Sequence, residues 1–249
     1  RQFPSPPVTG ISQVWILPHH ARDIHYLKTY YRTNDVFIIP YIWESTFIEE
    51  QYNLLNKNVN KPAKLLKHIN SICIFEPNIS VLKSCIVPLS IVEQYSRQYP
   101  DDLKNCHAFC CKDLVQNNFF KNLISHTDIV KRKDNFLQFH PRYYFLDAIN
   151  NLGSLVLSHQ ILNDLNNLYF DALYLDLPLV HNSSKLSEFG YYYPEYNTFK
   201  AVEQINYALK NHTSNISNYK ISNHRLFKSY NPLSSENLSI FSKLLTRNK

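Results

Sequence analysis

The hydrophobic pattern between residues 154 and 197 predicts a strand, a helix and a second strand. The apolar run from Leu155 to Leu157 is typical of a strand that is buried on both faces. Apolar residues then recur at every third or fourth position from Leu162 to Leu175, which places them on one side of a helix. Pro178 ends this pattern, and the short apolar run Leu179-Val180 follows it. We therefore expect a βαβ unit with two parallel strands and a right-handed crossover.

Polar residues follow both predicted strands at the point where each strand ends. Ser158 and His159 follow the first strand, and His181, Asn182 and Ser183 follow the second. The carboxyl ends of parallel strands meet at one edge of a sheet, and open α/β sheets bind their ligands there. We therefore expect these side chains to face a single crevice and to bind a ligand.

Further short apolar runs predict strands elsewhere in the chain, and helical patterns separate them. Because strands that alternate with helices form parallel sheets, this alternation predicts an α/β fold. The runs lie at residues 14–17, 36–39, 72–75, 106–111 and 136–139.

An Asn- and Lys-rich segment from Glu50 to Lys67 interrupts the alternation, and we interpret it as a connection between domains. We expect a partial N-terminal Rossmann-like domain at residues 1–64 and a second Rossmann-like domain at residues 65–230. Residues 231–249 are expected to form a terminal helix. The sequence begins at Arg1 and contains no methionine, and we expect its first domain to be incomplete.

The composition narrows the class of ligand. The 249-residue chain carries a net charge of +6, and its 26 basic residues are spread along the sequence apart from the local run Lys131-Arg132-Lys133. Nucleic-acid binding requires a contiguous basic face, so we expect a small anionic ligand and no nucleic acid. No apolar run reaches the roughly 18 residues that a membrane span needs, and we expect a cytoplasmic protein. The five cysteines include no CxxC pair, which indicates reduced thiols.

The scarcity of glycine excludes two classes of phosphate-binding protein. Gly10, Gly153 and Gly190 are the three glycines of the chain, so neither GxGxxG nor GxxxxGK[ST] can occur. This argues against a P-loop NTPase and against an ordinary nicotinamide or flavin dehydrogenase. A bound phosphate must then be held by helix N-termini, hydroxyls, amides and cations. No spacing of histidines and carboxylates indicates a metal site, and we expect neither a metal nor a resident cofactor.

Two strand ends of the second predicted domain carry candidate phosphate ligands. Asn78 or Ser80 can cap a helix after the strand at residues 72–75, and Lys83 then falls in the first turn of that helix. The helix dipole disfavours a cation there unless the lysine shares an anion with the free N–H groups, although a surface lysine would have the same spacing. Arg142 follows another strand, where its guanidinium can bind phosphate with two hydrogen bonds or form a structural ion pair.

Further candidate ligand contacts lie in and after the predicted βαβ unit. Asp171 lies on the helix face beside the expected crevice, where a carboxylate can accept hydrogen bonds from sugar hydroxyls. Gly190 lets the backbone approach a ligand closely, and Tyr191 can stack on a base or a sugar. The alternatives are an aspartate on a helix surface and an aromatic residue that only packs.

His20 and Glu44 are the candidate catalytic bases. Each follows one of the two strands predicted in the N-terminal segment, so each lies at a sheet rim where a titratable group can reach a hydroxyl. A capping or surface role is the alternative for both residues.

Several strings of the sequence carry a family resemblance. They are similar, in order along most of the chain, to strings of a little-characterised bacterial family that is assigned to the GT-B type of glycosyltransferase. The strings are PYIWES at residues 40–45, FEPNISVLKS at 75–84, SHQ at 158–160, LNNLYFDALYLDLPLVHNS at 165–183 and GYYYPEYN at 190–197.

The resemblance implies a GT-B arrangement of two Rossmann-like domains with parallel sheets, in which the second domain binds the donor. It implies metal-independent transfer of a sugar from a nucleotide-diphosphate sugar to a hydroxyl acceptor. The acceptor would be a glycan, or a hydroxyl group on a lipid or protein. Peripheral membrane association is compatible with that role. Lys83 and Arg142 would bind the diphosphate, Asp171 a hydroxyl of the ribose or sugar, and His181 and Asn182 the leaving group. The terminal helix would cross back to the first domain. The sequence carries no prediction of the oligomeric state.

Two other functions remain open from the sequence. One is a non-catalytic sugar- or nucleotide-binding module that is related to transferases, and the other is a sugar-nucleotide epimerase. A binding module would bind donor without turnover, whereas an epimerase would convert donor without an acceptor.

Overall fold

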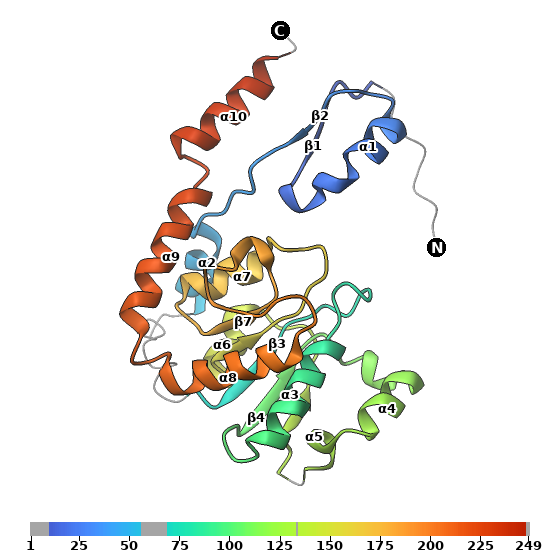
Figure 1. Ribbon diagram of the computed structural model, residues 1–249, viewed down its shortest axis with the longest axis vertical. Coiled ribbons are helices and arrows are strands. Elements are labelled where there is room, and N and C mark those ends of the chain that lie inside the picture. The colour runs from blue at the N-terminus through green and yellow to red at the C-terminus, as the bar shows by residue number, and fades with distance from the viewer. Residues whose placement is uncertain (1–9, 56–68, 133, 248–249) are drawn as a thin grey trace. The chain divides into compact units, whose positions relative to one another are not determined.

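The computed structural model describes residues 10–55, 69–132 and 134–247 of the chain. The chain divides into two units, and Figure 1 shows their elements coloured along the sequence. Unit 1 comprises Arg1–Glu44 with Phe227–Lys249, and unit 2 comprises Ser45–Leu226. The domain boundary that the sequence predicts near residue 65 lies outside the described residues.

Unit 2 is built on one parallel sheet, whose strand order is β5-β4-β3-β6-β7-β8. The register places Ile72 of β3 opposite Cys106 of β4 on one side and opposite Leu155 of β6 on the other. All pairs of this sheet are parallel, so the predicted parallel α/β fold is confirmed. The strands are β3 (Ser71–Ile74), β4 (Asn105–Ala108), β5 (Leu137–Phe139), β6 (Leu155–Leu157), β7 (Leu179–His181) and β8 (Tyr191–Tyr192).

Both faces of the central strands are buried, which explains their uninterrupted apolar sequences. Ile72 and Ile74 belong to the main hydrophobic cluster, together with residues of α3 (Ile86–Gln98) and α8 (Thr198–Asn211). Cys73 alternates with them and is buried on the opposite face of the sheet. A Cβ atom on Gly153 would lie 2.9 Å from the sulfur of Cys73, so glycine allows the chain to pack closely here.

Helices cover both faces of this sheet, and α3 packs beside α8 on one of them (Figure 1). Among the described residues, no helix has the length and apolar composition that a membrane crossing requires. The other helices of the unit are α2 (Thr46–Leu55), α4 (Asn118–Ser125), α5 (Asp128–Lys131), α6 (Phe145–Leu152), α7 (Asn167–Tyr174) and most of α9 (Ile216–Tyr230), with short 3-10 turns at Leu114–Gln116 and Ser184–Leu186.

Asparagine side chains define where several of these helices begin. Asn166 accepts a hydrogen bond from the backbone N–H of Tyr169 at the start of α7, and Asn197 accepts one from Lys200 at the start of α8. These caps satisfy N–H groups that have no partner within the helix. The helix expected from Leu162 therefore begins at Asn167, because the capping asparagine fixes its start.

Unit 1 contains a two-stranded parallel sheet of β1 (Val14–Ile16) and β2 (Val36–Ile38). The 3-10 helix η1 (Pro18–Asp23) and α1 (Ile24–Tyr31) connect the strands, as the alternation predicts. The terminal helix α10 (Ser235–Thr246) packs on this segment, with the rings of Trp15 and Phe241 5.8 Å apart. Gln13 Nε2 also donates a hydrogen bond of 3.1 Å to the carbonyl of Leu244.

Candidate functional site

A cavity of about 1110 Å³ opens in unit 2 at the carboxyl ends of β3, β4, β5 and β6. The strand order reverses beside β3, because β4 and β5 extend the sheet on one side and β6, β7 and β8 on the other. Helices that leave the sheet on opposite faces diverge at such a point and leave a crevice. The cavity therefore lies between the loops after β3 and β6, one strand away from the β6–β7 position that the sequence pattern favoured.

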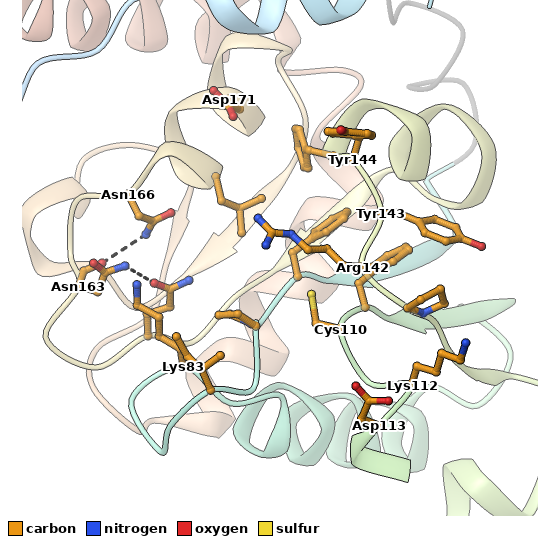
Figure 2. A pocket seen from close by; sticks show the side chains of 18 of the residues that line it. Lys83, Cys110, Lys112, Asp113, Arg142, Tyr143, Tyr144, Asn163, Asn166 and Asp171 are labelled. Atoms are coloured by element: carbon orange, nitrogen blue, oxygen red, sulfur yellow. Dashed lines mark hydrogen bonds between the residues drawn. The ribbon is translucent and has the colours of Figure 1, made fainter. Parts of the chain in front are cut away.

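The cavity wall carries cationic side chains without anionic partners. Lys83, Lys112 and Arg142 line the cavity, and within the described part of the chain none of the three forms an ion pair. In Figure 2, Arg142 lies between Lys83 and Asp171, a carboxylate of α7 that also lines the cavity. Unpaired cations beside hydrogen-bonding groups are suited to an anionic ligand.

Aromatic rings form another part of the wall. The rings of Phe75 and Phe109 stack with their centroids 4.5 Å apart, and the ring of Phe145 meets Phe75 edge-on at 5.1 Å. Tyr143 and Tyr144 also line the cavity and are exposed. Flat apolar surfaces of this kind can stack on a nucleobase or a sugar ring.

Side-chain amides complete the wall near α7. Asn166 Nδ2 donates to the carbonyl of Asn163, and Asn163 Nδ2 donates to Oε1 of Gln160 (Figure 2). All three residues line the cavity. This chain of amides fixes the loop after β6, so its remaining donors and acceptors are oriented before any ligand binds.

Lys83 and Arg142 reach the cavity, but the helix expected around Lys83 begins later. Asn78 adopts a left-handed backbone with φ of 56°, and its Oδ1 accepts a hydrogen bond of 2.8 Å from the N–H of Cys85. This arrangement holds an ordered loop until α3 begins at Ile86. Lys83 thus precedes the helix, where its backbone pairs with Gln160 in an isolated bridge.

Asn78 and Ser80 do not line the cavity. The amide of Asn78 also donates to the carbonyl of Glu76, at 2.9 Å, so its polar atoms stabilise the loop. Ser80 is exposed, and its Oγ accepts a hydrogen bond from the N–H of Leu82. Their expected contact with a donor stays a prediction that the geometry does not favour.

Ser158 and His159 are buried beneath the cavity instead of facing a crevice, and that expectation is wrong for both side chains. Ser158 Oγ lies 2.5 Å from Oε1 of Glu76. His159 Nδ1 lies 3.0 Å from the hydroxyl of Tyr193, which folds over the strand end. Burial lowers the pKa of His159 to about 4, so the imidazole is neutral at physiological pH.

His181 is also buried, and the structure corrects its expected exposure. Its Nε2 donates to the carbonyl of Phe189 at 2.8 Å, and its Nδ1 accepts from the N–H of Ser183 at 3.1 Å. Both ring nitrogens are therefore occupied, and burial lowers the pKa of His181 to about 4. The imidazole stabilises the turn after β7, and no ring nitrogen is left to orient a leaving group.

Asn182 and Ser183 also bond to other loops. The Asn182 side chain accepts from the N–H of Gln160 and donates to its carbonyl, both at 3.0 Å. Ser183 Oγ donates to the carbonyl of Asp164 at 2.7 Å. Asn182 thereby holds Gln160, a residue of the cavity wall, while neither Asn182 nor Ser183 lines the cavity.

Gly190 and Tyr191 pack inside unit 2. Gly190 has φ of 64°, and a Cβ atom there would lie 2.9 Å from the carbonyl oxygen of Leu179 and 3.0 Å from the ring of His181. The close approach that glycine permits is therefore to the protein. The hydroxyl of Tyr191 lies 2.8 Å from Nδ1 of His212 and is buried, so its ring is not free to stack on a ligand.

Glu76 is one residue of this region that the pattern analysis missed. It follows β3, it is fully buried, and burial raises its pKa to about 7. Phe75 and Pro77 on either side of it line the cavity. An acidic residue directly after a fully apolar strand could have indicated Glu76 as a candidate site residue, because burying a carboxyl group costs free energy.

The two candidate bases lie in unit 1. His20 lines a second cavity, of about 490 Å³, together with Trp15 and Tyr26. Its Nδ1 lies 3.4 Å from the carboxylate of Asp23, which can orient the ring. Glu44 is exposed and lies outside both of these cavities.

The sequence matches a family model described as protein of unknown function (DUF2827) over residues 8–245. The chain belongs to the DUF2827 family. No curated protein sequence matches it. The predicted family resemblance is therefore confirmed at the level of the family and, through the structures below, of the GT-B fold.

Three solved structures show what the DUF2827 chain resembles in three dimensions. S. aureus TarM, solved as a mutant with fondaparinux, alpha-GlcNAc-glycerol and UDP, matches with a TM-score of 0.61 at 14% identity, over 94% of this chain and 43% of that chain. A UDP-forming alpha,alpha-trehalose-phosphate synthase from Burkholderia xenovorans matches with a TM-score of 0.65 at 12% identity, over 94% of this chain and 62% of that chain. The pneumococcal O-GlcNAc transferase GtfA, solved with UDP and GlcNAc, matches with a TM-score of 0.55 at 11% identity, over 94% of this chain and 45% of that chain.

These structural similarities establish the fold of the DUF2827 chain as GT-B-like. The chain spans less than two thirds of the length of each of these structures. Among its described residues, no group of three or more histidine, cysteine, aspartate or glutamate side chains is placed to hold a metal ion.

Proposed function

We propose that this DUF2827 chain is a glycosyltransferase that transfers a sugar from a nucleotide-diphosphate sugar to a hydroxyl acceptor without a metal. The observation that carries the proposal is the cavity at the reversal of strand order, with unpaired Lys83 and Arg142 on its wall and Asp171 nearby. The GT-B-like fold supports the same conclusion, since TarM and GtfA, which share it, are solved with UDP. The glycan, lipid or protein acceptor and the cytoplasmic location stay predictions.

The donor would lie with its diphosphate against Lys83 and Arg142. When the bond between the anomeric carbon and the phosphate oxygen breaks, negative charge develops on the nucleotide diphosphate, and the two cations stabilise it. Asp171 accepts hydrogen bonds from hydroxyls of the ribose or the sugar. The stacked rings of Phe75 and Phe109 offer an apolar surface to the base.

The acceptor hydroxyl loses its proton as its oxygen bonds to the anomeric carbon. Of the two candidate bases, His20 has the better setting, because Asp23 Oδ2 lies 3.4 Å from its Nδ1 and can stabilise the imidazolium that forms. Trp15 and Tyr26, which line the same cavity, provide surfaces on which an acceptor sugar can stack. Glu44 remains the second candidate.

Two assays on the same preparation test the proposal. A thermal-shift screen with a panel of nucleotide sugars should raise the melting temperature, because a ligand that binds the folded state stabilises it by mass action. Release of free nucleotide is then measured with the best binder, with and without candidate acceptors. Acceptor-dependent release supports a transferase, and His20→Ala should lower its rate by about 100-fold.

The other outcomes identify the competing functions. Binding without any release indicates a sugar- or nucleotide-binding module, and acceptor-independent conversion of the donor sugar indicates an epimerase. A panel without any stabilising nucleotide sugar contradicts the proposed function. His25→Ala, which changes an exposed histidine of α1 that does not line the cavity of His20, is the matched control and should retain the rate.

A further inference from the structure

Glu76 has an incompletely hydrogen-bonded carboxyl group next to the cavity. The residue is fully buried, and its Oε2 has no hydrogen-bond partner among the described residues. Its neighbours Phe75 and Pro77 line the cavity. An unsatisfied buried carboxyl oxygen costs free energy, so its presence beside the cavity calls for a physical explanation.

The satisfied oxygen of Glu76 joins the loops on both sides of the crevice. Oε1 lies 2.5 Å from the hydroxyl of Ser158 and accepts a hydrogen bond of 3.2 Å from the N–H of His159. The side chain of Gln160 favours the ionised form of the Glu76 carboxyl group, and the backbone of Gln160 bridges to Lys83. The carboxyl group of the β3 loop therefore positions the β6 loop, and both loops contribute to the cavity wall.

Among the described residues, Lys83 is the cation that acts on this carboxyl group. The positive charge of Lys83 favours the ionised carboxylate, whereas burial disfavours it more strongly. The other titratable side chains that interact electrostatically with Glu76 are neutral near pH 7, because their pKa values are raised. They are Tyr169 of α7, Tyr193 after β8, Cys85 before α3 and Cys110 after β4.

Three further titratable side chains, Cys111, His107 and His140, lie near the same end of the sheet. Contact with Cys85 lowers the pKa of Cys111 from its ordinary value. His107 and His140 lie 3.0 Å apart through Nδ1 and Nε2, and burial lowers the pKa of both rings. Proton exchange by the histidine pair is the competing explanation that an experiment must separate from Glu76.

We propose that Glu76 is a proton-linked positioning residue, which takes a proton from solvent when an anionic ligand pairs with Lys83. The ligand neutralises the charge that favours the carboxylate and adds its own negative charge nearby, and both effects favour the protonated acid. By reciprocity, protonation of Glu76 strengthens anion binding. This inference rests on the proposed function for the identity of the anion, a nucleotide-diphosphate sugar.

Calorimetric titration in buffers of different ionisation enthalpy measures the proton directly. UDP-glucose is the first probe, because its diphosphate diester does not titrate near neutral pH. Wild type should take up a large fraction of one proton on binding near pH 7.5, and its affinity should fall about tenfold for each pH unit above the free-enzyme pKa of about 7. Glu76→Gln, a neutral mimic of the acid, should bind without proton uptake and with affinity independent of pH.

Three results overturn the inference. They are wild-type binding without proton uptake, equal uptake by Glu76→Gln, which would assign the proton to the His107–His140 pair, and an unchanged pH dependence in that variant. Inorganic sulfate, which is non-titrating, is the second probe if no nucleotide sugar binds. In that case the proposed function fails. The role of Glu76 is still supported if wild type takes up a proton when it binds sulfate and Glu76→Gln does not. If wild type takes up no proton with sulfate, that role is overturned.

Discussion

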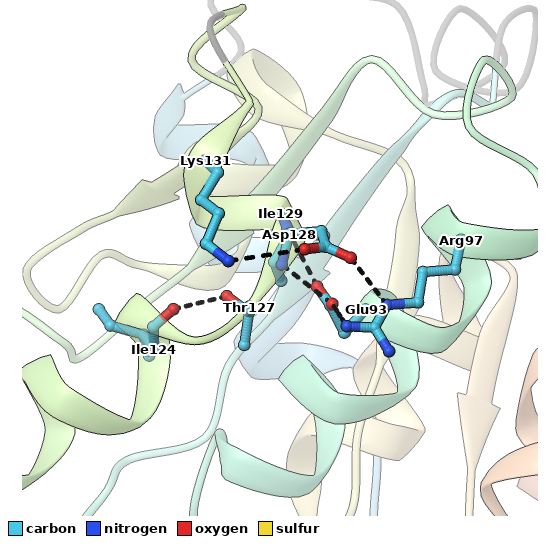
Figure 3. A network of polar contacts seen from close by, with 7 residues as sticks. All are labelled: Glu93, Arg97, Ile124, Thr127, Asp128, Ile129 and Lys131. Atoms are coloured by element: carbon cyan, nitrogen blue, oxygen red, sulfur yellow. Dashed lines mark hydrogen bonds and ion pairs between the residues drawn. The ribbon is translucent and has the colours of Figure 1, made fainter.

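Two buried glutamates of unit 2, Glu93 and Glu76, differ in how completely they are hydrogen-bonded. Glu93 of α3 accepts hydrogen bonds from the N–H groups of Asp128 and Ile129 at 2.9 and 3.0 Å, and Arg97 lies 2.7 Å from its Oε1 (Figure 3). Both of its oxygens are therefore occupied. Glu76, at the carboxyl end of β3, has one occupied oxygen and one that lacks a partner within the described part of the chain.

The difference separates a structural carboxylate from one that is available for function. Thr127, the residue before α5, uses its hydroxyl to donate to the carbonyl of Ile124, so Glu93 caps the N-terminus of α5 in its place (Figure 3). Its negative charge is stabilised by the N–H groups and by the guanidinium of Arg97. Glu76 lacks such a set of donors, and its pKa rises to about 7 through burial.

The largest predicted effect is the loss of the Glu93 cap. Glu93→Ala leaves two backbone N–H groups and Arg97 without their acceptor, and we expect the free energy of unfolding to fall by about 3 kcal/mol. Urea denaturation at neutral pH measures it. Glu203→Ala, which removes an exposed glutamate paired with Lys200 on α8, is the control and should cost within about 0.5 kcal/mol. Equal losses in the two variants would contradict the role of Glu93.

Glu76→Gln should have the opposite effect on stability, and the effect should depend on pH. The folded-state pKa of Glu76 is raised from 4.5 to about 7, so the folded protein retains a proton that the unfolded chain has lost, and wild-type stability is lost as pH rises across that window. Relative to wild type, Glu76→Gln should therefore gain up to about 3 kcal/mol between the two pH limits. Denaturation curves across this range test it, and a constant difference between the proteins would break the comparison.

The buried histidines allow the same comparison at a smaller scale. His181 uses both ring nitrogens, whereas Nε2 of His159 is buried without a partner in the described structure. His181→Phe should cost about 2 to 3 kcal/mol, because the carbonyl of Phe189 and the N–H of Ser183 lose their partners, and His159→Phe should cost about 1 kcal/mol. Unfolding at neutral pH gives both values, and an equal or reversed order would contradict the hydrogen-bond account.

Acidification should destabilise the folded protein through the same two histidines. Their pKa values are lowered from 6.5 to about 4, so stability is present above pH 6.5 and is lost as pH falls towards 4, where the unfolded chain binds protons that the folded protein excludes. Both phenylalanine variants should lose less stability than wild type on acidification. Unfolding curves at the two ends of this range test it.

The sequence predicted the strands and the parallel sheet because those features depend on local patterns. Buried strands read as short apolar runs, and β3, β5 and β6 lie where such runs occur. The strand β8 was not predicted, since its two tyrosines carry no periodic signal. Asn166 sets the start of α7 by a single hydrogen bond, which apolar spacing does not contain.

The candidate site was predicted unevenly for a similar reason. Lys83, Arg142 and Asp171 line the cavity, in the region where strand ends and a helix face were expected to meet. The direction of His159 and His181 could not be read from the sequence, because it depends on Tyr193 and Phe189, which fold back from later loops. Position after a strand indicates which edge of the sheet a residue occupies, while distant residues decide whether its side chain is covered.

The central claim is that the cavity of unit 2 binds a nucleotide sugar. Calorimetric titration of a double variant that carries both Lys83→Ala and Arg142→Ala tests this claim most directly. Wild type and Lys121→Ala, a change in a lysine of α4 outside the cavity, should bind the best nucleotide sugar of the thermal-shift panel with equal affinity. Removing both cations from the wall should weaken that affinity by about 100-fold or more, since each charge-assisted contact contributes roughly 1.5 to 3 kcal/mol. Unchanged affinity in the double variant would contradict the account.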